Sequence, residues 1–278
     1  MNVAASHEGY VPFRGYQTWY RIVGEQAAPE KLPLLCLHGG PGAPSYYLEP
    51  LVGMTATGRQ VILYDQLGCG RSDQPELEWS LAVFTEELER LRDHLGLERI
   101  HLLGTSWGGM LALEHALVHG DSVRSLILSS TLACAEDWVV EVKRLRDATG
   151  IADDEEANAE VERRHFFRGE SEPLELVRMR EEKNPAVYEA MWGRNEWTMT
   201  GALGGWDVRA RLAELKMPTL ILRGAHDLST PAISKTLTDG IPHAREVVFE
   251  ESSHTPVLEE TERYLQAVRE FLYAVEAR

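Results

Sequence analysis

Cysteine is scarce in this sequence, which contains three among its 278 residues. Cys36, Cys69 and Cys134 are far apart and irregularly spaced, so neither a disulfide framework nor a pair of zinc ligands is indicated. Cys36 falls in a short apolar run, and unpaired cysteines in such runs are usually buried. We therefore expect Cys36 to be a small core side chain and not a catalytic thiol.

Positive charge is also in short supply. The chain has 28 lysine and arginine residues against 44 aspartate and glutamate residues, a net charge of -16 at pH 7. An excess of acid this large repels phosphate backbones and anionic lipids. We therefore expect neither nucleic acid nor a membrane surface as a partner, and we expect a ligand that is neutral or cationic.

Long apolar runs, repeats and low-complexity tracts are missing from the sequence as well. No stretch approaches the length that crosses a bilayer, and residues 1–10 lack the apolar core and positive flank of a signal peptide. With 44% apolar and 26% charged residues, the composition excludes intrinsic disorder and allows a full hydrophobic core. We expect a soluble cytoplasmic protein, and the sequence leaves its oligomeric state open.

Short apolar runs alternate with helical patterns along most of the chain, which is typical of a parallel sheet. We predict strands at residues 34–37, 61–64, 100–103, 125–128, 219–222 and 246–249. Helical periodicity predicts helices at 81–95, 107–119 and 261–275. Two earlier runs, around Phe13 and at 19–23, predict an antiparallel hairpin at one edge. The predicted fold class is α/β, with a mostly parallel, doubly wound sheet.

The alternation is interrupted between residues 132 and 207. This segment is helical in pattern and carries 18 acidic and 10 basic residues, which gives it half of the net charge of the chain. Such a composition fits either solvated helix faces or an inserted helical lid. We predict a lid at 132–207 and a core made of residues 1–131 and 208–278.

A serine lies in the motif Gly-x-Ser-x-Gly at residues 104–108, directly after a predicted strand and before a predicted helix. A serine in such a tight turn adopts a strained backbone, and the flanking glycines remove the Cβ atoms that would clash. Its hydroxyl then projects above the sheet at the amino end of a helix, where the dipole favours developing negative charge. This setting predicts Ser106 as a nucleophile.

A serine nucleophile needs a base and an acidic group that orients the base. Asp227 follows the predicted strand at 219–222, and His254 follows the predicted strand at 246–249. Both would lie at the carboxyl edge of the sheet, and the chain order Ser, Asp, His is that of the α/β-hydrolases. We therefore predict a catalytic triad of Ser106, Asp227 and His254.

Acyl transfer also needs hydrogen-bond donors for the oxyanion. The predicted strand at 34–37 leads into a glycine-rich loop, His-Gly-Gly-Pro-Gly at 38–42, and no phosphate-binding motif is present in the chain. Glycines let the backbone approach a substrate closely. We assign the donors to the backbone N–H groups of Gly40 and Trp107.

One further pair of residues has the spacing of metal ligands. His115 and His119 lie four residues apart, but Ala116 stands where a zinc protease has glutamate. We expect packing or surface histidines, and we expect the protein to use neither a metal nor a cofactor.

Three motifs together resemble the proline iminopeptidases of the α/β-hydrolase superfamily. They are His-Gly-Gly-Pro-Gly at 38–42, Tyr-Asp-Gln-Leu-Gly-Cys-Gly-Arg-Ser at 64–72 and Gly-Thr-Ser-Trp-Gly-Gly at 104–109. The segment Asn-Glu-Trp-Thr-Met-Thr-Gly at 195–201 is similar to the lid of the branch typified by the tricorn-interacting aminopeptidase. The resemblance covers nearly the whole chain and implies an α/β-hydrolase fold with a helical lid.

The resemblance also implies how the substrate is held. In that family an acidic cluster near the nucleophile holds the free α-amine of the substrate, and Glu196 matches one of its glutamates. Members of the branch often have a second glutamate after the triad aspartate, where this chain has Leu228. We count Gly39, Glu196, Leu228, Trp192 and Trp197 as candidate substrate contacts, the last three suited to an apolar partner. Tryptophans of a lid also commonly pack it onto the core.

These observations lead us to expect a cofactor-free serine hydrolase that cleaves the amide bond of an N-terminal aminoacyl group. Its substrate would be a short peptide or a small natural product with a free amine. One alternative is an esterase or C–C hydrolase on the same scaffold, which would need no amine anchor. The other is a non-catalytic ligand-binding relative, which would not require all three groups of the triad. The sequence does not identify the aminoacyl group or the leaving amine.

Overall fold

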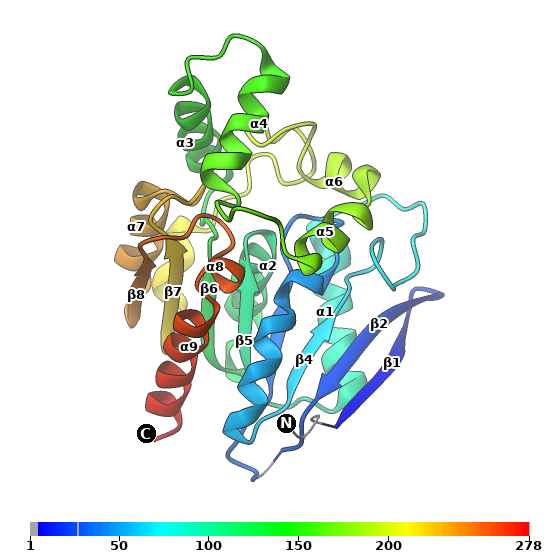
Figure 1. Cartoon of the computed structure of the whole chain (residues 1–278). Helices are drawn as coiled ribbons and strands as arrows, with labels where there is room; N and C mark the ends of the chain where they lie inside the picture. Colours follow the sequence, from blue (N-terminus) through cyan, green and yellow to red (C-terminus); the bar gives the residue numbers. More distant parts are fainter. Residues whose placement is uncertain (1–4, 27, 278) are drawn as a thin grey trace.

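The structure is a computed structural model that describes residues 5–26 and 28–277. Within these residues, eight strands form one sheet in the order β1-β2-β4-β3-β5-β6-β7-β8 (Figure 1). The strands are β1 (Ser6–Phe13), β2 (Tyr16–Val23), β3 (Leu34–Leu37), β4 (Val61–Tyr64), β5 (Ile100–Thr105), β6 (Val123–Ser129), β7 (Thr219–Gly224) and β8 (Ala244–Phe249).

The sheet is antiparallel at one edge and parallel elsewhere. Strands β1, β2 and β4 pair antiparallel, whereas the pairs from β4 through β3, β5, β6 and β7 to β8 are all parallel. The β1–β2 turn consists of Arg14 (φ 50°) and Gly15 (φ 86°), and two positive φ values suit the twist of a tight hairpin. The predicted edge hairpin and the mostly parallel α/β sheet are thus confirmed.

The central strands are apolar on both faces because helices cover both sides of the sheet. In β3, Leu35 and Leu37 pack into the hydrophobic cluster on one face, and Leu34 and Cys36 pack into the cluster on the other. Cys36 is fully buried, and burial raises the pKa of its thiol, as expected for a core side chain.

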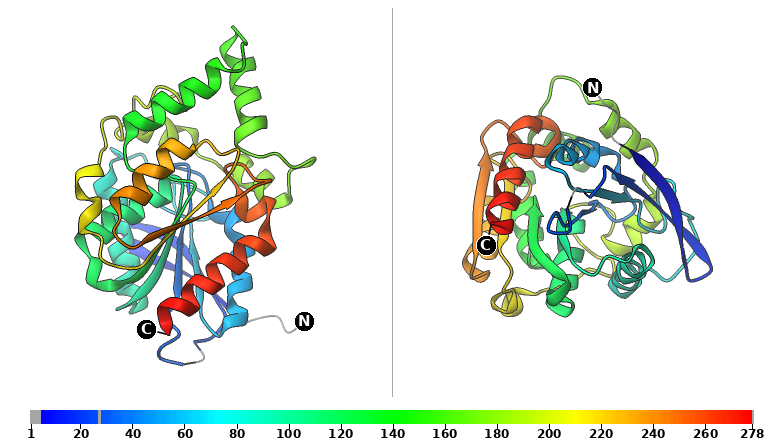
Figure 2. Two further views of the ribbon diagram at one scale, coloured as in Figure 1. Left: turned by 90° about the vertical axis from the view of Figure 1, so that its left-hand side faces the viewer. Right: turned by 90° about the horizontal axis from the view of Figure 1, so that it is seen from below.

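Helices form a layer on each face of the sheet (Figure 2). The helices α1 (Leu81–Leu95), α2 (Trp107–Val118) and α7 (Pro231–Gly240) contribute to one hydrophobic cluster. The 3-10 helix η1 (Ser45–Thr57) and α9 (Thr261–Glu276) contribute to the other. Shorter helical elements are η2 (Gly120–Ser122), η3 (Arg209–Glu214) and α8 (Pro256–Glu259).

The predicted long helices are confirmed, with boundaries that differ by at most one residue. Helix α1 ends where Gly96 adopts a left-handed conformation (φ 63°) and its N–H donates to the carbonyls of Arg92 and Asp93. In the part of the chain that the structure describes, no helix combines the length and apolar character needed to cross a membrane. The cytoplasmic location stays a prediction.

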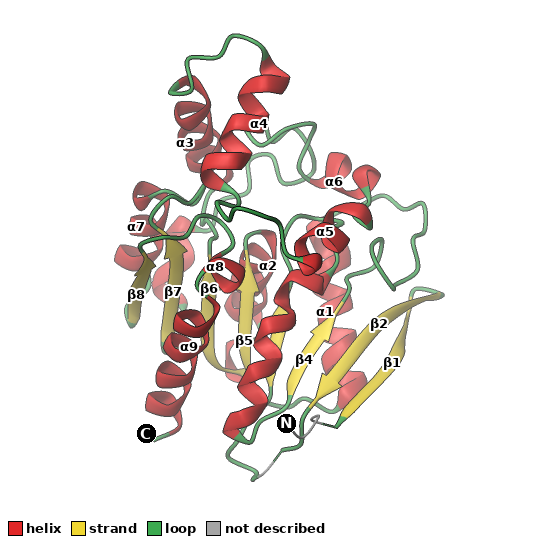
Figure 3. Cartoon of the chain, viewed as in Figure 1, coloured by secondary structure: helices red, strands yellow, loops and turns green. Residues whose placement is uncertain are grey.

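Between β6 and β7 the chain contains, besides η3, four α-helices, which lie beyond the carboxyl ends of the strands (Figure 3). They are α3 (Ala135–Asp147), α4 (Asp154–His165), α5 (Leu174–Glu181) and α6 (Pro185–Met191). The two ends of the segment meet at a bridge between Cys134 and Asp207, which is flanked by a 2.9 Å hydrogen bond from Val208 N to Ala133 O. The chain therefore leaves the sheet and returns to it at one place.

Candidate active site

The predicted nucleophile occupies the turn between β5 and α2. Ser106 has φ 53° and ψ -120°, a backbone conformation that residues other than glycine adopt rarely and at a cost. The glycines beside it permit the turn, because a Cβ on Gly104 would collide with the Gly108 carbonyl. The turn places Ser106 at the amino end of α2, where it lines a pocket above the sheet.

His254 and Asp227 form a buried pair after the last two strands. His254 Nδ1 lies 2.7 Å from Asp227 Oδ1. Asp227 also accepts hydrogen bonds from the backbone N–H groups of Ser229 (2.8 Å) and Gly224 (3.3 Å), which fix its carboxylate. With Nδ1 engaged, the imidazole has Nε2 free for the pocket that it lines together with Ser106.

The two predicted oxyanion donors come from different elements. Gly40 (φ 45°) lies in the loop after β3 and lines the pocket, and Trp107 is the first residue of α2. In residues 5–26 and 28–277, neither N–H group donates to a protein acceptor, as expected for a helix start and an open glycine loop. A Cβ on Gly39 would come within 2.9 Å of Ser106 Cβ, so the loop approaches the nucleophile as closely as glycine permits.

A buried hydrogen-bond network fixes this loop against the nucleophile turn. The Gln66 N–H donates to His38 Nε2 (2.9 Å), and the Gln66 side-chain amide donates to the His38 carbonyl (3.1 Å). The Trp107 indole N–H donates to Gln66 Oε1 (2.8 Å). Burial lowers the pKa of His38 to about 4, so its imidazole is neutral and can accept. Three loops at the carboxyl edge of the sheet are thereby held together.

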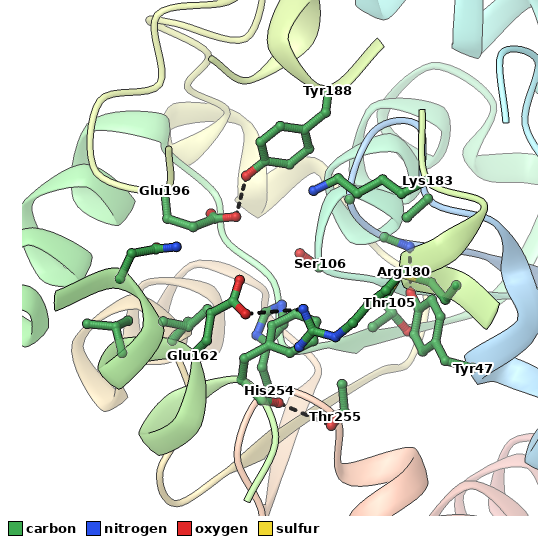
Figure 4. A pocket seen from close by; sticks show the side chains of 18 residues that line it. Tyr47, Thr105, Ser106, Glu162, Arg180, Lys183, Tyr188, Glu196, His254 and Thr255 are labelled. Carbon is green, nitrogen blue, oxygen red and sulfur yellow. Dashed lines mark hydrogen bonds and ion pairs between the residues drawn. The ribbon is translucent and has the colours of Figure 1, made fainter. Parts of the chain in front are cut away.

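A pocket lies over Ser106, and its far side consists of side chains from the segment 132–207 (Figure 4). The core contributes the glycine loop, the nucleophile, the histidine and Leu228. The segment contributes apolar, polar and charged side chains, which are Asn158, Val161, Glu162, Phe166, Met179, Arg180, Lys183, Tyr188 and Glu196. The core and the segment 132–207 therefore each contribute about half of the residues that line the site.

Glu196 reaches this pocket from the loop that follows α6. Its carboxylate accepts a hydrogen bond from the Tyr188 hydroxyl. Burial and the charge of Glu196 raise the pKa of Tyr188 well above its ordinary value, so the hydroxyl keeps its proton and donates. Among the ion pairs of the described residues none includes Glu196, which leaves the carboxylate able to take a cationic group.

Three more charged residues of the pocket were not singled out by the sequence analysis. Glu162 of α4 and Arg180 of α5 form an ion pair at 3.1 Å. Lys183, in the loop after α5, has its Nζ 3.5 Å from the centroid of the Tyr188 ring. No motif distinguishes these residues from the many other charges of the segment, and only the packing of α4 and α5 over the sheet brings them together.

The structure brings most of the predicted site residues together. Ser106, Gly39, Gly40, Leu228, Glu196 and His254 all line the pocket. Asp227 lies behind His254. Within the described part of the chain no hydrogen bond joins Ser106 to His254, a contact that in hydrolases often tightens when substrate binds.

Two predicted substrate contacts are not in the pocket. Trp192 is 2% exposed and packs edge-on against Trp138 with ring centroids 5.7 Å apart. Trp138 in turn packs against the His254 ring at 5.8 Å. Trp197 is half-buried against the hydrophobic core and lies under the Arg146 guanidinium. Trp192 belongs to the hydrophobic cluster that the segment shares with the core, and Trp197 packs against that cluster, where burying large aromatic rings is stabilising.

The histidine pair of α2 lies outside the pocket. His115 and His119 stack with centroids 5.0 Å apart, and both face Glu89 of α1. The three ligand atoms lie within 4.8 Å of one another, a spacing at which a divalent ion could be held. Glu89 is already engaged by Arg92 at 2.7 Å, so these residues form a polar cluster between two helices.

Comparison with known proteins agrees with this architecture. Residues 33–261 match the family model described as the alpha/beta hydrolase fold. The chain is 43% identical to a proline iminopeptidase of Clostridioides difficile, over 96% of this chain and 98% of that protein. It is similar to the crystal structure of a proline iminopeptidase of Mycobacterium smegmatis, with a TM-score of 0.89, 34% identity and coverage of 98% and 99%. The crystal structure of VinJ is similar too, with a TM-score of 0.90, 34% identity and coverage of 97% and 99%.

A strained serine turn, a buried Asp–His pair at the carboxyl edge of a mostly parallel sheet and a family match over most of the chain define an α/β-hydrolase. Within that class, the chain belongs to the proline iminopeptidase family and is a serine hydrolase of the aminopeptidase type. Membership of the branch typified by the tricorn-interacting aminopeptidase stays a prediction.

Proposed function

We propose that this protein releases the N-terminal residue, with proline as the first candidate, from short substrates whose α-amine is free. One observation carries the proposal: the amine-binding candidate Glu196 and the nucleophile candidate Ser106 line the same pocket, next to His254. An esterase would need the nucleophile and the base but not a carboxylate facing them. The proline iminopeptidases at about 40% identity support the choice of first residue.

Acylation would follow from the geometry of the core. Ser106 Oγ attacks the carbonyl carbon of the first residue while His254 Nε2 takes the hydroxyl proton. Asp227 holds His254 through Nδ1 and stabilises the imidazolium that forms. The backbone N–H groups of Gly40 and Trp107 donate to the oxyanion. Collapse of this intermediate breaks the C–N bond, and His254 returns its proton to the leaving amine.

Deacylation would repeat these steps with water as the nucleophile. His254 removes a proton from water, and the resulting hydroxide attacks the carbonyl carbon of the aminoacyl-serine ester. The same two N–H groups hold the second oxyanion. When the C–Oγ bond breaks, His254 gives its proton back to Ser106, and the free amino acid leaves with the enzyme restored.

The pocket wall would select the first residue by its charge and its shape. The substrate ammonium would donate to the Glu196 carboxylate, whose orientation the Tyr188 hydroxyl fixes. Leu228 and Phe166 would contact the apolar atoms of the first side chain. We further propose that residues 132–207 act as a lid, which supplies the amine anchor and encloses the substrate over Ser106.

A panel of substrates tests this proposal. Arylamides of proline, alanine, glycine and a β-amino acid would be assayed with free and with blocked amines, together with a small activated ester. We expect hydrolysis of the free-amine arylamides, fastest for proline, and almost none of the blocked ones. Equal turnover of free and blocked amines would overturn the aminopeptidase assignment in favour of an esterase-type enzyme.

A further inference from the structure

Lys183 is a charged side chain of the pocket that the proposed mechanism does not use. It lies in the loop between α5 and α6, and its amine points into the cavity that contains Ser106 (Figure 4). In the described ranges of the chain it belongs to no ion pair, and its one close aromatic contact is the Tyr188 ring. Burial lowers the pKa of Lys183, and the charges of Glu196 and Glu162, neither of which is within ion-pair distance of its amine, offset only part of that effect.

The other cation of the pocket differs from Lys183 in this respect. Arg180 lies 3.1 Å from Glu162 and 3.1 Å from Glu172, and its guanidinium is 5.0 Å from the centroid of the Phe166 ring. Its charge is therefore balanced within the protein. Of the two cations that line the pocket, Lys183 is the one left for a ligand.

Lys183 and Glu196 are complementary in charge and are held by the same tyrosine. The Tyr188 hydroxyl donates to the Glu196 carboxylate, while the face of the same ring lies under Lys183 Nζ. One rigid side chain thus positions an acceptor for a cation and a donor for an anion on the same wall. A ligand that satisfies both must carry a positive and a negative group, which is the charge pattern of a short peptide with free termini.

We propose that Lys183 binds the C-terminal carboxylate of the residue that leaves, so that the preferred substrates are dipeptides with both termini free. This inference rests on the proposed aminopeptidase function. In a dipeptide the ammonium belongs to the acyl residue and the carboxylate to the leaving residue, on either side of the bond that Ser106 attacks. Lys183 has three donors for that carboxylate, and an ion pair in a partly buried pocket is stronger than one in water.

The test compares three substrates with the same N-terminal proline and a free amine. They are a dipeptide with a free carboxylate, the same dipeptide as its C-terminal amide, and an uncharged arylamide. Each kcat/KM is measured for the wild type, Lys183→Met, Lys183→Arg and the matched control Lys143→Met. Lys143 is exposed on α3 and does not line the pocket, so its removal changes the net charge equally.

We expect the wild type to prefer the free dipeptide over its amide by about tenfold or more, as a charge-assisted contact allows. Lys183→Met should abolish the preference by lowering kcat/KM for the free dipeptide alone, mainly through KM. Lys183→Arg should keep part of the preference, and Lys143→Met should keep all of it. Thermal unfolding of each variant verifies that the fold is retained.

Two results would overturn the inference. A wild type that hydrolyses the dipeptide and its amide equally well has no carboxylate subsite. If Lys183→Met lowers kcat/KM for all three substrates in equal proportion, the lysine acts on the amine site or on the lid and does not bind the carboxylate. Hydrolysis of the free-amine arylamide but not of its N-blocked form by the wild type separates these results from failure of the proposed function, because an esterase-type enzyme would cleave both forms.

Discussion

The core and the segment 132–207 hold their functional side chains in different ways. In the core, Ser106, Asp227 and His254 follow the ends of strands, and backbone hydrogen bonds fix the carboxylate. In the segment, Glu196 and Lys183 come from loops and are positioned through one tyrosine ring. In the proposed function, the core sets the chemistry through backbone geometry, and the segment sets the choice of substrate through side-chain contacts.

This difference predicts two kinds of variant. A change in the core machinery should affect every substrate alike, because each one needs the nucleophile, the base and the oxyanion donors. A change in the segment should affect only those substrates that carry the group it recognises. The following experiments test whether the two regions can be separated in this way.

The largest effect is expected for Ser106→Ala. Turnover of all substrates should fall by at least about a thousandfold, because no other group in the mechanism can form the acyl-enzyme. The unfolding midpoint should not fall, since alanine leaves no buried polar group without a partner. Steady-state assays and thermal unfolding measure the two effects, and Ser171→Ala, at an exposed position of the segment, serves as the control. Substantial activity in purified Ser106→Ala would contradict the mechanism.

The next effect concerns stability and lies wholly in the core. Glu87 of α1 is buried and accepts hydrogen bonds from Thr18 and Leu67, and burial raises the pKa of its carboxyl to about 8. Between pH 4.5 and 8 the folded protein therefore holds a proton that the unfolded chain has released, so stability falls as pH rises through this window. A pKa shift of this size can lower the free energy of unfolding by at most about 5 kcal/mol across the window.

Replacement by glutamine should remove this pH dependence. Glu87→Gln mimics the protonated carboxyl, so it should match the wild type near pH 4.5 and become progressively more stable than the wild type toward pH 8.5. Chemical denaturation at several pH values measures the difference. The neighbouring Glu86→Gln, on the exposed side of α1, should change little. If the stability of Glu87→Gln changed with pH in the same way as that of the wild type between pH 4.5 and 8.5, Glu87 would not be protonated in the folded protein.

A moderate and selective effect is expected in the segment. Glu196→Gln should lower kcat/KM for free-amine substrates by about ten- to a hundredfold, the value of one charge-assisted contact. A small activated ester without an amine should be hydrolysed at nearly the wild-type rate. Glu189→Gln, an exposed glutamate of α6, is the matched control. Equal losses on both kinds of substrate would mean that Glu196 supports the fold of the pocket and does not anchor the amine.

The contrast between the regions also explains what could be predicted from the sequence. Strands such as β3 and β4 are short apolar runs bounded by loops, so their residues were identified without the structure. The Ser106 turn and the glycine loop are constrained by backbone sterics, which leave a clear pattern of glycines. Asp227 and His254 could be predicted because the carboxyl ends of parallel strands meet at one edge of a sheet.

The segment offered no comparable constraint. Glu196 was found through family resemblance, whereas Lys183, Glu162 and Arg180 were not found at all. Their positions depend on how short amphipathic helices pack over the sheet, a tertiary effect that local periodicity does not encode. The same tertiary effect explains why the tryptophans could not be placed from the sequence. Trp192 is predicted to contact the substrate, but the packing of the segment directs it toward Trp138.

The smallest effect is expected for Trp197→Phe, which tests whether this tryptophan lies outside the substrate site. Because Trp197 packs outside the pocket, the substitution should change kcat/KM by no more than about twofold on any substrate, as for residues away from a functional contact. Its consequence should instead be a slightly lower unfolding midpoint, since a smaller ring buries less apolar surface against the core.

Phe166→Leu is the contrasting variant, because Phe166 lines the pocket and its ring lies 5.5 Å from that of His254. It should alter kcat/KM among free-amine substrates according to the size of the first residue. If Trp197→Phe altered this selectivity as strongly as Phe166→Leu, the indole would belong to the substrate site, and the boundary drawn between packing and recognition in the segment would be wrong.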